Sequence, residues 1–354
     1  MLNNTNKSLS FTKNSIVDLI IRLRTILVLL ILIAVFGIIS DTFFTLNNAI
    51  LVMKHVALYS FIGIGMTFVI ITGGIDLSVG SIAGLSGMIA GFLINRGIHV
   101  PALGGTVYFA APIVILITLI VGALFGMFNA LLVGVLKMPP FIATLGTMYM
   151  ARGFANLISG GLTFPNLAGT EEHGNKGFEI LGTGKWLNIP VQIWIMILMI
   201  CIGAFILNKT VLGSHIYAVG GNLEAARLSG IKTSKVLFFV YGFSGALAAV
   251  TGMVAASQLV ASHPATGETW ETYAIAATVL GGTSMSGGTG KVGGTVIGLF
   301  VITVLNDGMV MVGISEFWQK VITGIVVIVA VIFDIYQQKI KDRISLNMEM
   351  KKEH

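Results

Sequence analysis

The sequence predicts an all-α fold: a polytopic membrane bundle of about ten transmembrane helices, with broken helices and a possible internal duplication. Of its 354 residues, 55% are hydrophobic and only 10% are charged. Many apolar runs reach the roughly 20 residues that a helix needs to cross the hydrocarbon layer. These runs are continuous rather than alternating, which favours spanning helices, with backbone groups paired inside each helix, over the strands of a barrel.

The apolar runs divide the chain into ten predicted crossings. The runs near 78–94 and 272–286 are short and rich in glycine or threonine, so either is a candidate for a broken or partly inserted helix. Together the crossings define a transmembrane domain over 25–336, between a 1–24 segment and a 337–354 tail. In order, the predicted crossings are 25–40, 50–71, 78–94, 108–136, 141–159, 189–208, 236–259, 272–286, 292–312 and 318–336.

The distribution of basic residues sets the predicted orientation. Arg22 and Arg24 precede the first crossing, and Lys339, Lys341 and Arg343 follow the last. Lysine and arginine accumulate on the cytoplasmic side of a bacterial inner membrane. An even number of crossings returns the chain to the side on which it started, so we expect a multi-pass inner-membrane protein with both termini in the cytoplasm.

The same orientation places the loops. The basic loop 209–235 is expected inside, and the segment 160–188, which mixes acidic and basic residues, is expected outside. The formal net charge of +6 is then explained by the membrane rule. Membrane lipid is the expected partner of these basic clusters, and nucleic acid is not.

The sequence offers no set of residues for catalysis or cofactor binding. The single cysteine, Cys201, allows neither an intramolecular disulfide nor a thiolate metal cluster. Gly290-Lys291 lacks the Ser or Thr that follows lysine in a phosphate loop. No nucleophile, base and orienting group can be assembled from the polar residues. We therefore expect a protein that is not an enzyme and that binds no metal, cofactor or ATP itself.

Glycines recur at helical spacing in several crossings. In the third crossing they lie four, three and four residues apart, so they share one face and allow another backbone to approach closely. We interpret them as helix-packing positions. They are Gly80, Gly84, Gly87 and Gly91, and the pairs Gly122 with Gly126 and Gly294 with Gly298 repeat the pattern.

Two segments between apolar runs resemble each other. One covers 72–81 and the other 280–288, and each has a Gly-Gly pair followed by hydroxyl residues and more glycine. Transporters are often built from duplicated halves whose broken helices expose backbone groups to a cavity, so we assign both segments to a translocation path. The residues concerned are Gly73, Gly74, Ser78, Gly281, Gly282, Thr283 and Ser284.

Three polar residues within or beside apolar runs have two interpretations each. Asp76 follows the first Gly-Gly pair, where an acid at membrane depth would face a cavity or a partner. It would equally cap the following helix together with Ser78. Asn129 and Arg152 are open to the same two interpretations, a role facing a cavity or a structural hydrogen bond.

A polar helical insert, Gly220 to Gly230, interrupts the membrane sequence inside the basic loop. Its run of good helix formers ends at a glycine, as expected of a short helix on the inner face. Taken alone, this insert is compatible with an ordinary cytoplasmic helix.

Glu224-Ala225-Ala226, with Gly230 following, resembles the docking loop of permease subunits of ATP-binding-cassette importers. Over 40–336 the chain is similar to the ribose-type sugar permeases of bacterial importers. The resemblance implies that one set of residues couples the protein to an ATPase: Gly221, Asn222, Glu224, Ala225, Ala226, Arg227 and Gly230. The stretches that carry it are 65–81, 140–147, 220–231 and 274–284.

The resemblance implies a set of partners. They are a cytoplasmic ATP-binding-cassette ATPase, which would hold ATP and Mg²⁺, an extracytoplasmic sugar-binding protein, and a second permease copy. The chain departs from the importer pattern after Gly230, where the usual Ile-x-Leu-Pro ending is missing. The external segment 170–184 is also distinctive, which leaves the binding protein open.

The expected substrate is a neutral sugar, a pentose or hexose, or a sugar-like signal molecule, moved by alternating access. Small, weakly polar side chains can bind a polyol without trapping it, and they add Asn129, Phe141, Thr144, Gly146 and Thr147 to the path. A second hypothesis is an ion-coupled secondary carrier with Asp76 as its coupling site. A membrane-embedded enzyme is a third and the weakest.

Overall fold

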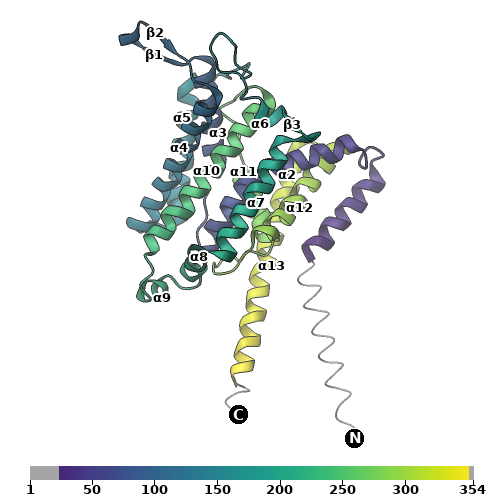
Figure 1. The fold of residues 1–354 in the computed structure, drawn as a ribbon. Coiled ribbons are helices and arrows are strands. Elements are labelled where there is room, and N and C mark those ends of the chain that lie inside the picture. The colour runs from purple at the N-terminus through teal and green to yellow at the C-terminus, as the bar shows by residue number, and fades with distance from the viewer. Residues whose placement is uncertain (1–23, 351–354) are drawn as a thin grey trace.

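The computed structural model describes residues 24–350; residues 1–23 and 351–354, parts of the predicted terminal segments, lie outside it. Its helices stand side by side as a bundle, which confirms the predicted all-α class (Figure 1). The bundle helices are Arg24–Ile39, α2 Leu46–Ile71, α3 Val79–Asn95, α4 Ala111–Ala130, α5 Pro140–Ser159, α7 Val191–Lys209, α10 Thr233–Leu259, α11 Trp270–Leu280, α12 Val292–Met311 and α13 Glu316–Met350.

Five of the described helices are long and apolar enough to cross a membrane: α2, α4 with the π-helical turn Leu131–Val135, α7, α10 and α12. Helix Arg24–Ile39 and α3 are shorter apolar helices. The predicted crossing 272–286 is broken, because α11 ends at Leu280 after 11 residues and covers only about 16 Å. α13 continues as helix to Met350, past the predicted end of the last crossing.

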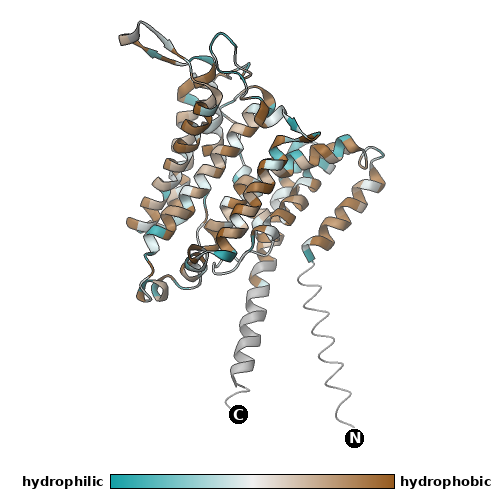
Figure 2. Cartoon of the chain, viewed as in Figure 1, coloured by the Kyte–Doolittle hydropathy of each residue, from teal (hydrophilic) through white to brown (hydrophobic). Residues whose placement is uncertain are grey.

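The two ends of the bundle differ. One end carries two short antiparallel hairpins, β1 Ile98–Val100 with β2 Gly105–Val107 and β3 Lys185–Trp186 with β4 Ile189–Pro190, together with α6 Ile180–Thr183. The other end carries α8 Val211–Gly221 and α9 Leu223–Leu228 (Figure 1). The hydrophobic residues lie along the bundle helices between these ends (Figure 2). The segments 160–188 and 209–235 therefore lie at opposite ends.

The centre of the bundle is α10, which packs against α2, α3 and α4. Its contact with α4 depends on glycine: a Cβ atom at Gly122 or Gly126 would overlap the backbone of Gly245 or Tyr241. Gly298 of α12 packs in the same way against the Ala277 backbone of α11. The predicted packing role of these glycine pairs is confirmed.

The glycine face of α3 meets a different partner from the one predicted. Only Gly87 faces a helix backbone, that of Gly252 in α10. Gly80, Gly84 and Gly91 instead face the irregular segment 261–269, which joins α10 to α11 and passes close along α3. The small residues thus make room for non-helical backbone inside the bundle, which is tolerated only where protein or a cavity surrounds it.

Candidate functional site

The α8–α9 unit is formed by local capping. The Thr210 hydroxyl accepts a hydrogen bond from the Gly213 amide at 3.1 Å and begins α8. The Asn222 side chain accepts one from the Ala225 amide at 2.9 Å and begins α9. Gly230 has a φ of 84°, which suits glycine, and the Ile231 amide bonds back to the Ala226 carbonyl at 3.1 Å. The sequence therefore specifies a short helix with defined ends.

The surface of α9 faces outward almost entirely. Ala226 is its buried anchor, whereas Gly221 and Ala225 are exposed. Glu224 and Arg227 form an ion pair of 3.3 Å that is itself exposed on both sides. Leu228 is 83% exposed. The end of the bundle thus presents a charged pair and a large apolar side chain on one short, well-defined helix.

α8 lies directly against both glycine-rich segments. Gly220 packs on the Ile71 carbonyl, so closely that no side chain fits there. The Gly288 amide donates a hydrogen bond to the same Ile71 carbonyl at 2.8 Å, and the Tyr217 hydroxyl donates one to the Gly290 carbonyl at 2.8 Å. Burial raises the pKa of Tyr217, which keeps this hydroxyl protonated as a donor. A movement of α8 would therefore be transmitted to both segments through these contacts.

Most of the predicted glycine-rich path residues belong to this junction. Gly73 and Gly74 line a cavity of about 310 Å³ between the end of α2, the α4–α5 connection, α8 and α10. Gly281 packs closely against the backbone of Gly294 in α12, and Gly282 has a left-handed backbone conformation with a φ of 89°. Thr283 and Ser284 are buried, and the Ser284 amide bonds to the Thr289 carbonyl at 3.0 Å. The structure thus places the two segments beside each other.

Asp76 is fully buried at the start of α3. Its carboxylate accepts hydrogen bonds from the Ser78 amide at 3.0 Å, the Ser78 hydroxyl at 2.5 Å and the Ser244 hydroxyl at 3.3 Å. The Asn129 amide nitrogen donates to the Ser78 hydroxyl at 2.8 Å and lies 3.5 Å from Asp76. This network ties α4 and α10 to the Ser78 turn that precedes α3, so the geometry favours a structural hydrogen-bond role for Asp76. The predicted cap itself is not formed, because the Ser78 side chain makes no cap bond and Asp76 accepts from the Ser78 amide rather than from an amide of α3.

The path residues predicted on α5 separate into two groups. The Thr144 hydroxyl donates to the Ile75 carbonyl at 3.2 Å and so joins the Asp76 neighbourhood. Thr147 is buried and bonds within its own helix. Phe141 is half-exposed, and a Cβ atom at Gly146 would have no neighbour within 4 Å. These last two residues lie on an open face of α5.

A cavity of about 400 Å³ lies between α3, α5 and the start of α11, and the sequence did not lead us to it. Arg152 of α5 donates hydrogen bonds to the carbonyls of Pro264 and Thr266, the latter at 2.8 Å. It thereby holds the irregular segment 261–269, which brings Glu268 to the cavity wall and leads into α11, where Glu271 lies in the first turn. The lining residues are Ser81, Met148, Tyr149, Arg152, Glu268, Thr269 and Glu271.

The acids were missed because 260–271 reads as an ordinary connection between two predicted crossings. The available signal was a pair of glutamates three residues apart, next to a short crossing, with Arg152 unpaired inside an apolar run elsewhere. Charged side chains inside a membrane bundle are rare, and they commonly mark a substrate pathway.

Comparison with known proteins gives one family. The family described as "Branched-chain amino acid transport system / permease component" matches residues 48–331. The ribose import permease protein RbsC of Bacillus subtilis is 42% identical over 313 residues, 88% of this chain and 92% of the relative. RbsC of Haemophilus influenzae is 38% identical over 317 residues, 90% and 94% of the two chains.

A third relative, the autoinducer 2 import system permease protein LsrC of Photorhabdus luminescens, is 35% identical over 330 residues, 92% of this chain and 94% of the relative. No solved structure matches the chain. The family match covers most of the sequence, and this chain aligns with the three relatives over nearly their full lengths. The aligned region includes the helical bundle and the α8–α9 unit. The chain therefore belongs to the permease-component family of branched-chain amino acid transport systems, the membrane subunits of ATP-binding-cassette importers.

Proposed function

We propose that this permease passes a neutral sugar, or a sugar-like signal molecule, from an external binding protein to the cytoplasm by alternating access. The observation that carries the proposal is the α8–α9 unit: it exposes Glu224, Arg227 and Leu228, and behind them Gly220 and Tyr217 contact both glycine-rich segments. A partner that moves α9 would thereby act on the end of α2 and on the connection between α11 and α12. ATP and Mg²⁺ belong to that partner, a cytoplasmic ATPase.

The substrate class follows from the cavity beside α5. Its polar wall combines the carboxylates of Glu268 and Glu271 with the hydroxyls of Ser81 and Thr269. Carboxylates accept hydrogen bonds from sugar hydroxyls and repel anions. Arg152 already donates to two carbonyls, so it contributes little to the capture of an anion. The relatives are named for ribose and autoinducer 2, both of which fit a polyol site of this kind.

The arrangement of partners follows from the two ends of the bundle. We place the α8–α9 end and both termini in the cytoplasm, and the hairpin end with 160–188 outside, where the binding protein would dock. A second permease copy would meet the open face of α5. That face exposes Tyr149 by 69% and Leu157 by 77%, and it carries Gly153, whose Cβ position has no neighbour within 4 Å. Large apolar exposure together with small residues suits helix association in a membrane.

Co-purification tests the docking claim. The permease is purified in mild detergent from its native host, and mass spectrometry reports whether a nucleotide-hydrolysing subunit accompanies it. Glu224→Lys reverses the charge on α9, whereas Glu172→Lys makes the same reversal in the exposed segment at the opposite end. We expect the ATPase with the wild type and with Glu172→Lys, and its loss with Glu224→Lys. An ATPase retained by Glu224→Lys would contradict the proposal.

A further inference from the structure

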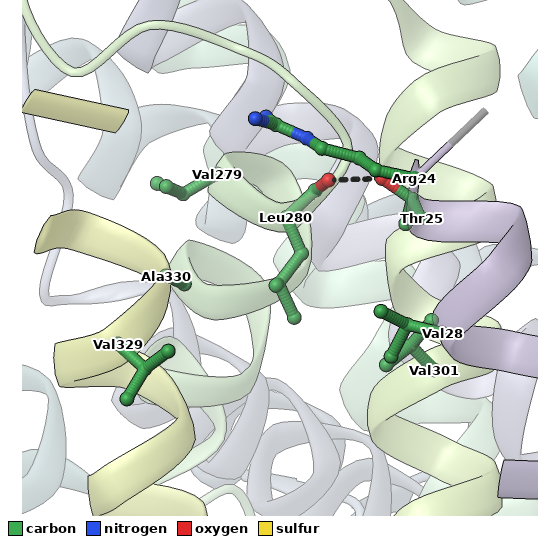
Figure 3. Close-up of a pocket in the computed structure, with 8 residues that line it drawn as sticks. All are labelled: Arg24, Thr25, Val28, Val279, Leu280, Val301, Val329 and Ala330. Atoms are coloured by element: carbon green, nitrogen blue, oxygen red, sulfur yellow. Dashed lines mark hydrogen bonds between the residues drawn. The ribbon is translucent and has the colours of Figure 1, made fainter. Parts of the chain in front are cut away.

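A third cavity, of about 260 Å³, lies between helix Arg24–Ile39, α11, α12 and α13. Figure 3 shows its lining side chains, which come from these four elements and surround one space. Six of the eight are aliphatic, and the two polar residues, Arg24 and Thr25, lie together at one edge. The aliphatic residues are Val28, Val279, Leu280, Val301, Val329 and Ala330.

The cavity adjoins the broken end of α11. Leu280 is the last residue of that helix, so its carbonyl has no partner further along the helix. The Thr25 hydroxyl donates a hydrogen bond to this carbonyl at 2.6 Å, and the bond is drawn in Figure 3. It fixes the first described turn of helix Arg24–Ile39 to the break in α11, and the aliphatic cavity lies beside this bond.

The surroundings of the cavity are those of a bilayer-facing surface. Ile31 of the first helix and Ile328 of α13 are each 60% exposed, and Val329, which lines the cavity, is 56% exposed. In a membrane protein such exposed aliphatic faces contact acyl chains. The cavity therefore opens among side chains that face the bilayer, with Arg24, the first described residue, at its edge.

We propose that this cavity holds an acyl chain of an anionic phospholipid whose phosphate is bound by Arg24. The aliphatic wall excludes sugars and ions, because no polar partner would replace the water that they lose. A guanidinium at the edge of an apolar cavity selects an anionic headgroup, since arginine binds phosphate with paired donors. Basic pockets between membrane helices take anionic lipids for this reason. The bound lipid would brace helix Arg24–Ile39 against the α11 break.

Native mass spectrometry of the intact importer, in detergent with phosphatidylglycerol or phosphatidylcholine, tests the site. We expect the wild type to retain phosphatidylglycerol in preference to phosphatidylcholine. Arg24→Gln should reduce that preference about fivefold, the usual contribution of one basic side chain near an anionic surface. Ala330→Phe fills the cavity and should abolish retention of both lipids. Ile328→Phe, on the same helix but outside the lining, serves as the matched control and should behave as the wild type.

The proposal is overturned if the wild type shows no preference between the two lipids, or if Arg24→Gln keeps the full preference. It is also overturned if Ala330→Phe retains lipid, or if light scattering shows that Ala330→Phe separates permease copies, because the cavity would then belong to a protein interface. Arg24 is half-buried at the edge of the cavity and is not part of its aliphatic wall, so Arg24→Gln decides the question even if Ala330→Phe fails to fold.

Discussion

Replacing Asp76 separates a structural role from a role in ion coupling. Asp76→Ala removes the acceptor of three buried hydrogen bonds, donated by the Ser78 amide, the Ser78 hydroxyl and the Ser244 hydroxyl. Each buried donor left without a partner costs about 1–3 kcal/mol. The two hydroxyls can rotate to other acceptors and the amide cannot, so we expect a loss of about 3 kcal/mol in the free energy of unfolding.

Asp76→Asn is the matched control for shape. Its carbonyl oxygen can occupy the Oδ1 position and keep both bonds from Ser78, while its amide nitrogen can donate to the Ser244 hydroxyl, which is able to accept. The expected cost is therefore at most about 1 kcal/mol, the net value of an ordinary hydrogen bond. This variant removes the charge and retains the network.

Two assays read these variants. Heating the detergent-solubilised protein before size-exclusion chromatography gives an apparent Tm. For a chain of this size, 1 kcal/mol corresponds to a shift of about 2 °C. We therefore expect the apparent Tm to fall by about 6 °C for Asp76→Ala and by at most about 2 °C for Asp76→Asn. ATP-driven sugar uptake into proteoliposomes should survive in Asp76→Asn. A stable Asp76→Asn variant without uptake would refute the structural role of Asp76, as would an Asp76→Ala variant as stable as the wild type.

Three further changes test other parts of the structure. Gly84→Leu should cost about 1–3 kcal/mol by overpacking against the Thr266 carbonyl and Arg152. Gly293→Leu, at an open position of α12 outside the proposed α5 interface, should leave the apparent Tm unchanged, and equal Tm values for the two variants would remove the packing argument. Glu271→Gln should lower sugar uptake about tenfold while the ATPase still co-purifies, because a hydrogen bond from a sugar hydroxyl to the charged carboxylate contributes about 1.5–3 kcal/mol. Undiminished uptake would exclude this cavity from the translocation path. Tyr217→Phe should raise the ATP hydrolysed per sugar imported by loosening α8 from the Gly290 carbonyl, and an unchanged ratio would show that this bond transmits nothing.

The fold was predictable from the sequence where local rules decide it. Apolar runs gave the long helices, and glycine spacing gave the close contact of α4 with α10, because both depend on neighbours along one helix. The α9 caps at Asn222 and Gly230 are equally local. Asp76 could be narrowed only to two interpretations, since its decisive partner, Ser244, lies 168 positions further along the chain.

The candidate sugar cavity was out of reach for a different reason. Its wall depends on an irregular segment passing along α3, and irregular backbone has no periodicity to detect. The glycines at helical spacing on α3 correctly predicted that another backbone approaches this face. They did not predict that the backbone is the irregular segment 261–269, because a helix and an irregular segment need the same free space. Arg152 holds that segment through carbonyl groups, which every residue has, so the sequence contains no matching side chain to find.

The likeness of the segments 72–81 and 280–288 acquires a mechanical meaning once they are seen against α8. Each is the turn at the end of a helix, and both share one carbonyl: that of Ile71, which ends α2, accepts the amide of Gly288, which lies beyond the end of α11. Gly220 fits on this same point because it has no side chain. A displacement of α8 is therefore expected to act on the end of α2 and on residues 288–290, which lie in the connection between α11 and α12. That connection leads back to α11, which covers only about 16 Å and begins at the cavity wall with Glu271 in its first turn. We therefore expect movement at the α8–α9 end to reach the proposed sugar site through the connection and this one short helix.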